Sequence, residues 1–148
     1  IGDEKVLHYS NGVPLYANSI KERNEDAREA FLIECLWKQG KIYRACEFIL
    51  NEALSRARGK TLLNAVLKLL ANSNGLRLNE ISKGVYRSSA VTKNLVDRLV
   101  AVDLISKDGN LYVLKDSVLK FWLKQVNAGV EFDFEPDKNL LRNIEVDF

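Results

Sequence analysis

The chain has 148 residues, of which 47% are hydrophobic and 28% are charged. This length suits one domain or two very small ones, and the hydrophobic content is sufficient for a buried core, which excludes a disordered or fibrous protein. Lysine and arginine number 22 against 20 aspartate and glutamate, so the net charge is +2. Binding of nucleic acid through bulk charge alone is therefore excluded, and any such surface must be local.

The charges are unevenly distributed along the chain. Residues 1–59 carry nine basic and nine acidic side chains, residues 60–130 carry eleven and five, and residues 131–148 carry two and six. The middle segment thus has a charge of +6 and the last segment a charge of −4. A surface that contacts phosphate is expected in the middle segment.

Cysteine and histidine are too scarce for a disulfide framework or a zinc site. Cys35, Cys46 and His8 are the whole set, and we expect the two cysteines to be half-buried helix thiols. No nucleophile or acid occurs at a sequence spacing from His8 or Tyr9 that matches a known catalytic motif, so we assign no catalytic residue and no metal ligand. No stretch of about 20 apolar residues suggests a membrane span, and a signal peptide is lacking. We expect a reducing, cytoplasmic setting.

The first 59 residues predict helices only. The turn signal Asn11-Gly12-Val13-Pro14 precedes a short helix, because proline is tolerated in the first helical turn. Asn24 is expected to cap a second, amphipathic helix that ends at Gly40, and Gly59 is expected to end a third. The three predicted helices cover residues 13–23, 24–40 and 42–58.

From Lys60 the pattern predicts a helix-turn-helix. A strongly apolar helix over residues 62–70 ends in Asn72-Ser73-Asn74-Gly75, and a short helix that carries Leu78 and Ile81 is expected to break at Gly84. Ser88 or Ser89 then caps a further helix. Its apolar positions recur at spacings of four, four and three, at Val91, Leu95, Leu99 and Val102.

The next residues predict a wing. Two short β-prone runs, 104–107 and 111–114, flank Asp108-Gly109-Asn110, a hairpin signal. Asp116 caps a closing helix over 117–126, whose Leu119, Phe121, Trp122 and Leu123 are expected to cover the core rather than to stack on bases. The sequence thus predicts a mainly α protein: a helical, lid-like segment (1–59), a winged helix-turn-helix with a two-stranded hairpin wing (60–127) and an acidic tail that docks (128–148).

The winged helix suggests a DNA-binding site. In this interpretation the helix 89–99 enters the major groove with four side chains toward bases or phosphates, while three others reach the backbone. The alternative is a solvated or protein-facing surface, which Asp97 and Asp108 favour because carboxylates repel phosphate. The acidic tail is a further candidate for covering the basic face in place of phosphate. The predicted DNA contacts are Ser89, Thr92, Lys93 and Asn94 on the helix, and Arg87, Lys107 and Asn110 for the backbone.

Two motifs resemble the archaeal P-loop ATPases of the AAA+/STAND type. Residues 12–16, Gly-Val-Pro-Leu-Tyr, resemble the Gly-x-Pro-Leu lid motif of that family, and Tyr112-x-Leu114-x-Asp116 through Phe121-Trp122 resembles the end of its winged helix. The resemblance implies that Gly12 and Pro14 contact the adenine of a bound nucleotide; the alternative is a plain turn and helix start. Ser117 and Asp103 depart from the usual proline and glycine of the family.

The resemblance also implies an ATPase core that this chain lacks. No Gly-x-x-x-x-Gly-Lys-Ser/Thr run and no apolar run ending in paired acids is present, so the chain has no machinery for hydrolysis. Since it contains no methionine and starts at Ile1, we expect a fragment of a longer protein that binds ATP and magnesium.

The function that the resemblance implies is that of a C-terminal regulatory region, whose winged helix binds DNA or a protein partner according to nucleotide state. The first alternative is a free-standing winged-helix transcription regulator whose first helices form a dimer or ligand interface. The second is a protein-interaction module that does not bind DNA.

Overall fold

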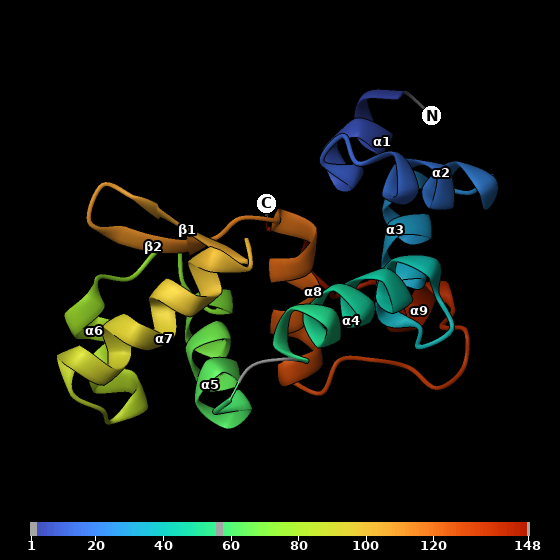
Figure 1. Ribbon diagram of the computed structural model, residues 1–148. Helices are drawn as coiled ribbons and strands as arrows, with labels where there is room; N and C mark the ends of the chain where they lie inside the picture. Colours follow the sequence, from blue (N-terminus) through green and yellow to red (C-terminus); the bar gives the residue numbers. More distant parts are fainter. Residues whose placement is uncertain (1–2, 56–57, 148) are drawn as a thin grey trace. The chain divides into compact units, whose positions relative to one another are not determined.

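A computed structural model of the chain describes residues 3–55 and 58–147 (Figure 1). This described part is mainly helical, with nine helices and one two-stranded antiparallel sheet, which confirms the predicted fold class. It divides into two compact units. Unit 1 comprises residues 1–49 and 125–148, and unit 2 comprises residues 50–124. Residues 50–55, 58 and 59, which we predicted as part of the lid, thus belong with the winged helix, and the tail belongs with the first helices.

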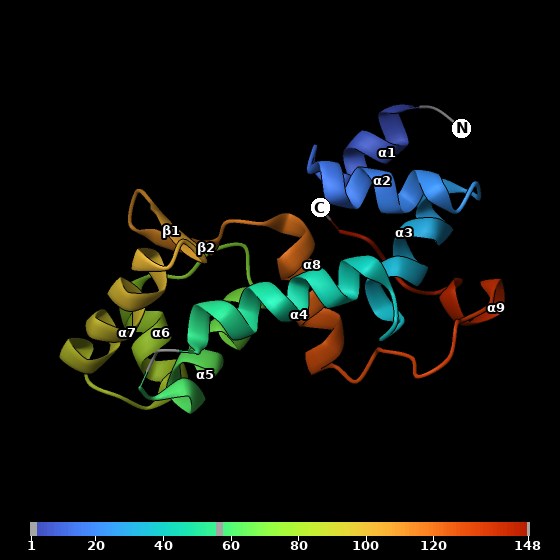
Figure 2. The same ribbon diagram turned by 45° about the vertical axis from the view of Figure 1, so that its right-hand side comes forward.

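Unit 1 is built around one nearly fully buried helix. In Figure 2, α1 (Asp3–Ser10) and α2 (Pro14–Glu22) cross the N-terminal end of α3 (Ala27–Leu36), and the Tyr9 ring stacks on that of Phe31 at 5.5 Å. Pro14 opens α2, as predicted. No helix was predicted for α1, because only Val6 and Ser10 are buried along it and so little periodicity can be read from it.

Two boundaries in unit 1 differ from the prediction. Asp26, and not Asn24, caps α3 by accepting a hydrogen bond from the Glu29 N–H at 3.2 Å, while Asn24 adopts a left-handed conformation. The helix ends at Leu36 rather than at Gly40, because Trp37 is extended and bridges to Phe132. Two other side chains are also more enclosed than we predicted: the cysteines Cys35 and Cys46 are fully buried.

The helix α4 (Lys41–Leu54) runs from unit 1 into unit 2 and is shorter than predicted. The prediction extended it to residue 58, but positions 56 and 57 lie outside the described residues. Gly59 is left-handed, with φ of 73°, and it stands at the N-cap of α5 (Lys60–Ala71). The glycine therefore marks the start of the next helix.

Unit 2 contains the predicted winged helix. After α5 come α6 (Leu78–Val85), α7 (Ser89–Ala101), the strands β1 (Ile105–Asp108) and β2 (Leu111–Leu114), and α8 (Ser117–Asn127), which continues into unit 1. Ser88 caps α7, and Asp116 caps α8 by accepting from the Val118 N–H at 2.8 Å. The strand pair joins Ile105 to Leu114 and Asp108 to Leu111, so the wing turns in two residues, with Gly109 left-handed.

The core of unit 2 confirms one part of the prediction and corrects another. Phe121 and Trp122 are buried, as predicted. Gly84, however, does not break α6, which continues to Val85. A Cβ at position 84 would lie 2.5 Å from Cδ1 of Leu69, so the glycine serves the close approach of α6 to α5.

The tail docks on unit 1 through its backbone and its acids. The Phe132 N–H donates to the Leu36 carbonyl at 2.9 Å, and the Arg28 guanidinium donates to the Leu141 carbonyl at 3.1 Å, at the end of α9 (Lys138–Leu141). Three of its acidic side chains bind residues of their own unit, and the hypothesis that the tail covers the basic face of the winged helix stays a prediction. The pairs are Tyr43 with Glu131, Lys38 with Asp133 and Arg23 with Glu135.

None of the described helices combines the length and the hydropathy needed to traverse a bilayer.

Candidate nucleic-acid interface

The helix α7 separates a buried face from an exposed one. Ser89, Lys93 and Asn94 are exposed, as their predicted role requires. Thr92 is fully buried, so its prediction as a DNA contact is wrong. It lies three and four residues before Leu95 and Val96 and therefore shares the face that packs on the core. The polar side chain of Thr92 had suggested a contact with DNA, but its position in the helical repeat places that side chain on the buried face of α7.

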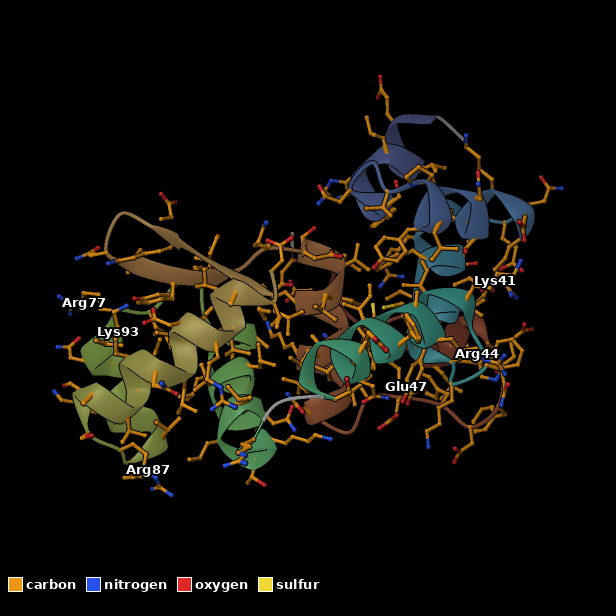
Figure 3. All side chains as sticks on the ribbon, viewed as in Figure 1. Lys41, Arg44, Glu47, Arg77, Arg87 and Lys93 are labelled. Carbon is orange, nitrogen blue, oxygen red and sulfur yellow. The ribbon has the colours of Figure 1, made fainter. Side chains whose placement is uncertain are left out.

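Three cations from separate segments converge around Tyr112 of β2. The Leu76 and Tyr112 backbones exchange hydrogen bonds of 3.1 and 2.8 Å, which places Arg77, the next residue, at the edge of the hairpin. Lys107 Nζ lies 5.7 Å from the centroid of the Tyr112 ring. Lys93 of α7 lies on the same side of unit 2 as Arg77 (Figure 3). We call Arg77, Lys93 and Lys107 the Tyr112 cluster.

Two cations of the Tyr112 cluster hold carboxylates. Lys93 Nζ lies 2.5 Å from Asp97 Oδ1, and this hydrogen bond raises the pKa of Lys93. Glu80 accepts from the Arg77 N–H at 2.9 Å and from Arg77 Nε at 3.3 Å, and these bonds lower the pKa of Glu80. Both pairs lie in solvent, where such pairs are weak and exchange readily. The carboxylates therefore compete with an incoming phosphate without excluding it.

The turn between α6 and α7 carries a fourth cation. Arg87 is exposed, and its Nη1 donates to the Tyr86 carbonyl at 3.0 Å. In Figure 3 Arg87 lies at this turn, away from Arg77 and Lys93, which lie toward the hairpin. The predicted contacts thus form two groups. Asn110, exposed at the tip of the wing, completes the set.

Tyr86, directly before Arg87, is a residue that the sequence analysis did not single out. Its side chain is 86% exposed, and its backbone is left-handed, with φ of 57°. Both properties are unusual for a large aromatic residue. The only signal in the sequence is its place between two helices, next to the capping serine.

The residues assigned to adenine lie at the start of α2. Gly12 is left-handed, with φ of 73°, and Pro14 is the first residue of the helix; both are exposed. Gly12 lines a hollow of about 410 Å³ in unit 1, but Pro14 does not. The other lining residues are Glu4, Val6, Leu7, Ser10, Ala17 and Lys21.

Neither a metal centre nor a known relative helps to define the site. Among the described residues, no three side chains of the His, Cys, Asp and Glu types gather where they could hold a metal ion. Comparisons of the chain with protein-family models, with curated proteins and with solved structures find no match. The resemblance to the archaeal ATPases therefore stays a prediction.

Proposed function

We propose that unit 2 binds double-stranded DNA through the exposed face of α7 and the wing. The observation that carries this proposal is that three cations from separate segments lie on one side of unit 2: Lys107 beside the Tyr112 ring, Arg77 next to the Leu76–Tyr112 bridge, and Lys93 on the same side of α7. The exposed helix has a shape that fits the major groove, and the cations beside it neutralise the phosphates that border the groove. Ser89 and Asn94, exposed on the same helix, supply groups that hydrogen-bond to bases or phosphates.

The proposed complex is weak and depends strongly on salt. Arg77, Arg87, Lys93 and Lys107 offer about four phosphate contacts, which correspond to a slope of about −3.6 in log affinity against log salt. Asp97 and Asp108 reduce the net attraction. We expect dissociation constants of roughly 10⁻⁶ to 10⁻⁴ M at physiological salt, the range of non-specific binding.

Lys93→Glu is the test of this proposal. The variant is expected to lower the affinity for a labelled duplex about tenfold and to reduce the salt slope by about 1, because one phosphate contact is lost and a repulsion is added. Asp97→Asn is expected to raise the affinity about threefold, because it frees Lys93 from its carboxylate. Fluorescence anisotropy at several salt concentrations measures both effects.

Lys5→Glu is the matched control for Lys93→Glu. Lys5 is an exposed lysine of unit 1, so the variant changes the net charge by the same amount outside the proposed face. Its binding should stay within twofold of the unchanged chain. Equal losses in the two variants, or no binding of any duplex, would overturn the proposal and favour a protein-facing winged helix.

A second proposal concerns unit 1 and comes from the resemblance to the ATPases. We propose that residues 1–59 act as the nucleotide lid of an ATPase whose nucleotide state governs the winged helix. The observation that favours it is the left-handed Gly12, which lines the hollow beside α1 and α2. ATP, magnesium and the residues of the phosphate site would belong to the preceding core.

The present chain is expected to bind ATP weakly or not at all. A lid provides contacts to the base, whereas most of the binding free energy of a nucleotide comes from a phosphate-binding loop and its metal ion. Isothermal titration calorimetry with magnesium-ATP measures this directly. A micromolar dissociation constant for this chain alone would contradict the assignment of unit 1 as a lid without its core.

A further inference from the structure

Tyr86 combines two unfavourable features at one position. Its backbone is left-handed, a conformation that favours glycine, and its aromatic side chain is almost entirely in solvent. Phe48, the next most exposed of the large hydrophobic residues of the described part, is 66% exposed and lies in an ordinary helix. The left-handed residue closes α6, a position at which glycine is the usual residue, so the turn itself gives no reason for an exposed tyrosine there.

The turn holds Tyr86 in a fixed place. The Tyr86 N–H donates to the Lys83 carbonyl at 3.4 Å, and the Arg87 N–H donates to the Ser82 carbonyl at 3.1 Å, so both residues are tied to the end of α6. Arg87 Nη1 in turn donates to the Tyr86 carbonyl. Two residues later Ser88 caps α7. The backbones of these two consecutive residues are therefore fixed just before the proposed groove helix begins, and both side chains are exposed there.

We infer that Tyr86 is a second DNA-backbone contact, made beside Arg87 and separate from the Tyr112 cluster. This inference rests on the proposed function of unit 2. The phenol O–H donates to a phosphate oxygen, as tyrosine hydroxyls do in protein–DNA complexes, and Arg87 supplies charge to the same stretch of backbone. The ring covers the adjacent sugar, which explains an aromatic side chain where a glycine would relieve the backbone strain.

Two separate groups of contacts imply a duplex. Each groove of DNA is bordered by one phosphate chain on either side. Arg77 and Lys93 lie toward the hairpin and Arg87 lies at the α6–α7 turn (Figure 3), so each group reaches a different part of the backbone when α7 occupies the groove. A single strand offers only one chain of phosphates. Loss of the Tyr86 contact should therefore weaken duplex binding more than single-strand binding.

Tyr86→Gly separates this role from a structural one. The variant is expected to raise the melting temperature, because glycine adopts the left-handed conformation without strain, and yet to lower duplex affinity about tenfold. Its salt slope should stay unchanged, because tyrosine is neutral, whereas Arg87→Ala should reduce the slope by about 1. Tyr86→Phe should lower the affinity about threefold, since it removes only the hydroxyl.

Asn24→Gly is the matched control. Asn24 is also left-handed, with φ of 51°, but it lies in unit 1, so its replacement should raise the melting temperature without changing DNA affinity. Full duplex affinity in Tyr86→Gly, with the loss in Lys93→Glu retained, would overturn the inference and leave the proposed function standing. Full affinity in Tyr86→Phe would overturn the phosphate hydrogen bond. Absence of duplex binding in the unchanged chain would overturn the inference and the proposed function together.

Discussion

Gly40→Ala is expected to destabilise unit 1 by at least about 3 kcal/mol, a severe case of overpacking. A Cβ at position 40 would lie 2.7 Å from the Glu34 carbonyl carbon and closer still to its oxygen. These are backbone atoms of α3, so no side-chain rotation relieves the clash. Gly40 itself cannot retreat easily, because its N–H donates to the Trp37 carbonyl at 2.7 Å and its carbonyl accepts from the Arg44 N–H at 3.0 Å.

The two tryptophans allow this loss to be located. Trp37 lies in unit 1 and Trp122 in unit 2. In a Trp122→Phe background, tryptophan fluorescence during chemical denaturation therefore reports on the unfolding of unit 1 alone. Gly84→Ala is the matched control, because its Cβ would meet the flexible end of Leu69 in unit 2. It should cost less than Gly40→Ala and should leave the Trp37 signal unchanged. An unaltered unfolding midpoint for Gly40→Ala would show that the loop at residues 37–40 can move away from α3.

Phe121→Ala is expected to destabilise unit 2 by about 3–5 kcal/mol, the range for truncating a buried phenylalanine. Phe121 is 2% exposed and lies on α8 next to Trp122, also buried. Its removal deprives the core of a large apolar side chain and leaves a cavity behind. Denaturation monitored by Trp122 fluorescence in a Trp37→Phe background measures the loss, and duplex binding should fall with the folded fraction.

Phe48→Ala is the corresponding control. It makes the same substitution on a helix, but Phe48 is 66% exposed. Its expected cost lies within about 0.5 kcal/mol, as for other surface substitutions. Similar midpoints for Phe121→Ala and Phe48→Ala would contradict the burial of Phe121.

The elements that could be predicted from the sequence are those defined by neighbouring residues. Ser88 and Asp116 cap the helices that follow them, and Gly109-Asn110 forms the turn between the paired strands, because each signal acts over two to four residues. The error at Gly84 has the opposite origin, because this glycine makes room for Leu69 on another helix. The error at Asn24 is local: Asp26, two residues later, has an equally suitable side chain and caps the helix instead.

The place of the tail could not be predicted for a similar reason. Arg28 donates a hydrogen bond to the Leu141 carbonyl, which lies more than a hundred residues away along the chain. The residues around either position give no signal that predicts this contact. In the candidate site, the charge and place of Lys93 and Lys107 were predicted, but the position of Lys107 beside the Tyr112 ring was not. Thr92 and Tyr86 show most clearly what the sequence could not reveal. The polar side chain of Thr92 suggested a surface contact but is buried, and nothing in the sequence indicated that the aromatic side chain of Tyr86 is exposed.

The division of the chain into units also sets an order of assembly during synthesis. Unit 2 is one continuous segment, whereas unit 1 joins residues 1–49 to residues 125–148. Since a ribosome delivers the chain from its N-terminus, every residue of the winged helix is available before Phe132 reaches its partner at Leu36. While the winged helix folds, the surface of helices α1 to α3 that contacts the tail therefore stays exposed. A premature stop codon in the last segment would leave the winged helix complete but would remove the part of unit 1 that covers this surface.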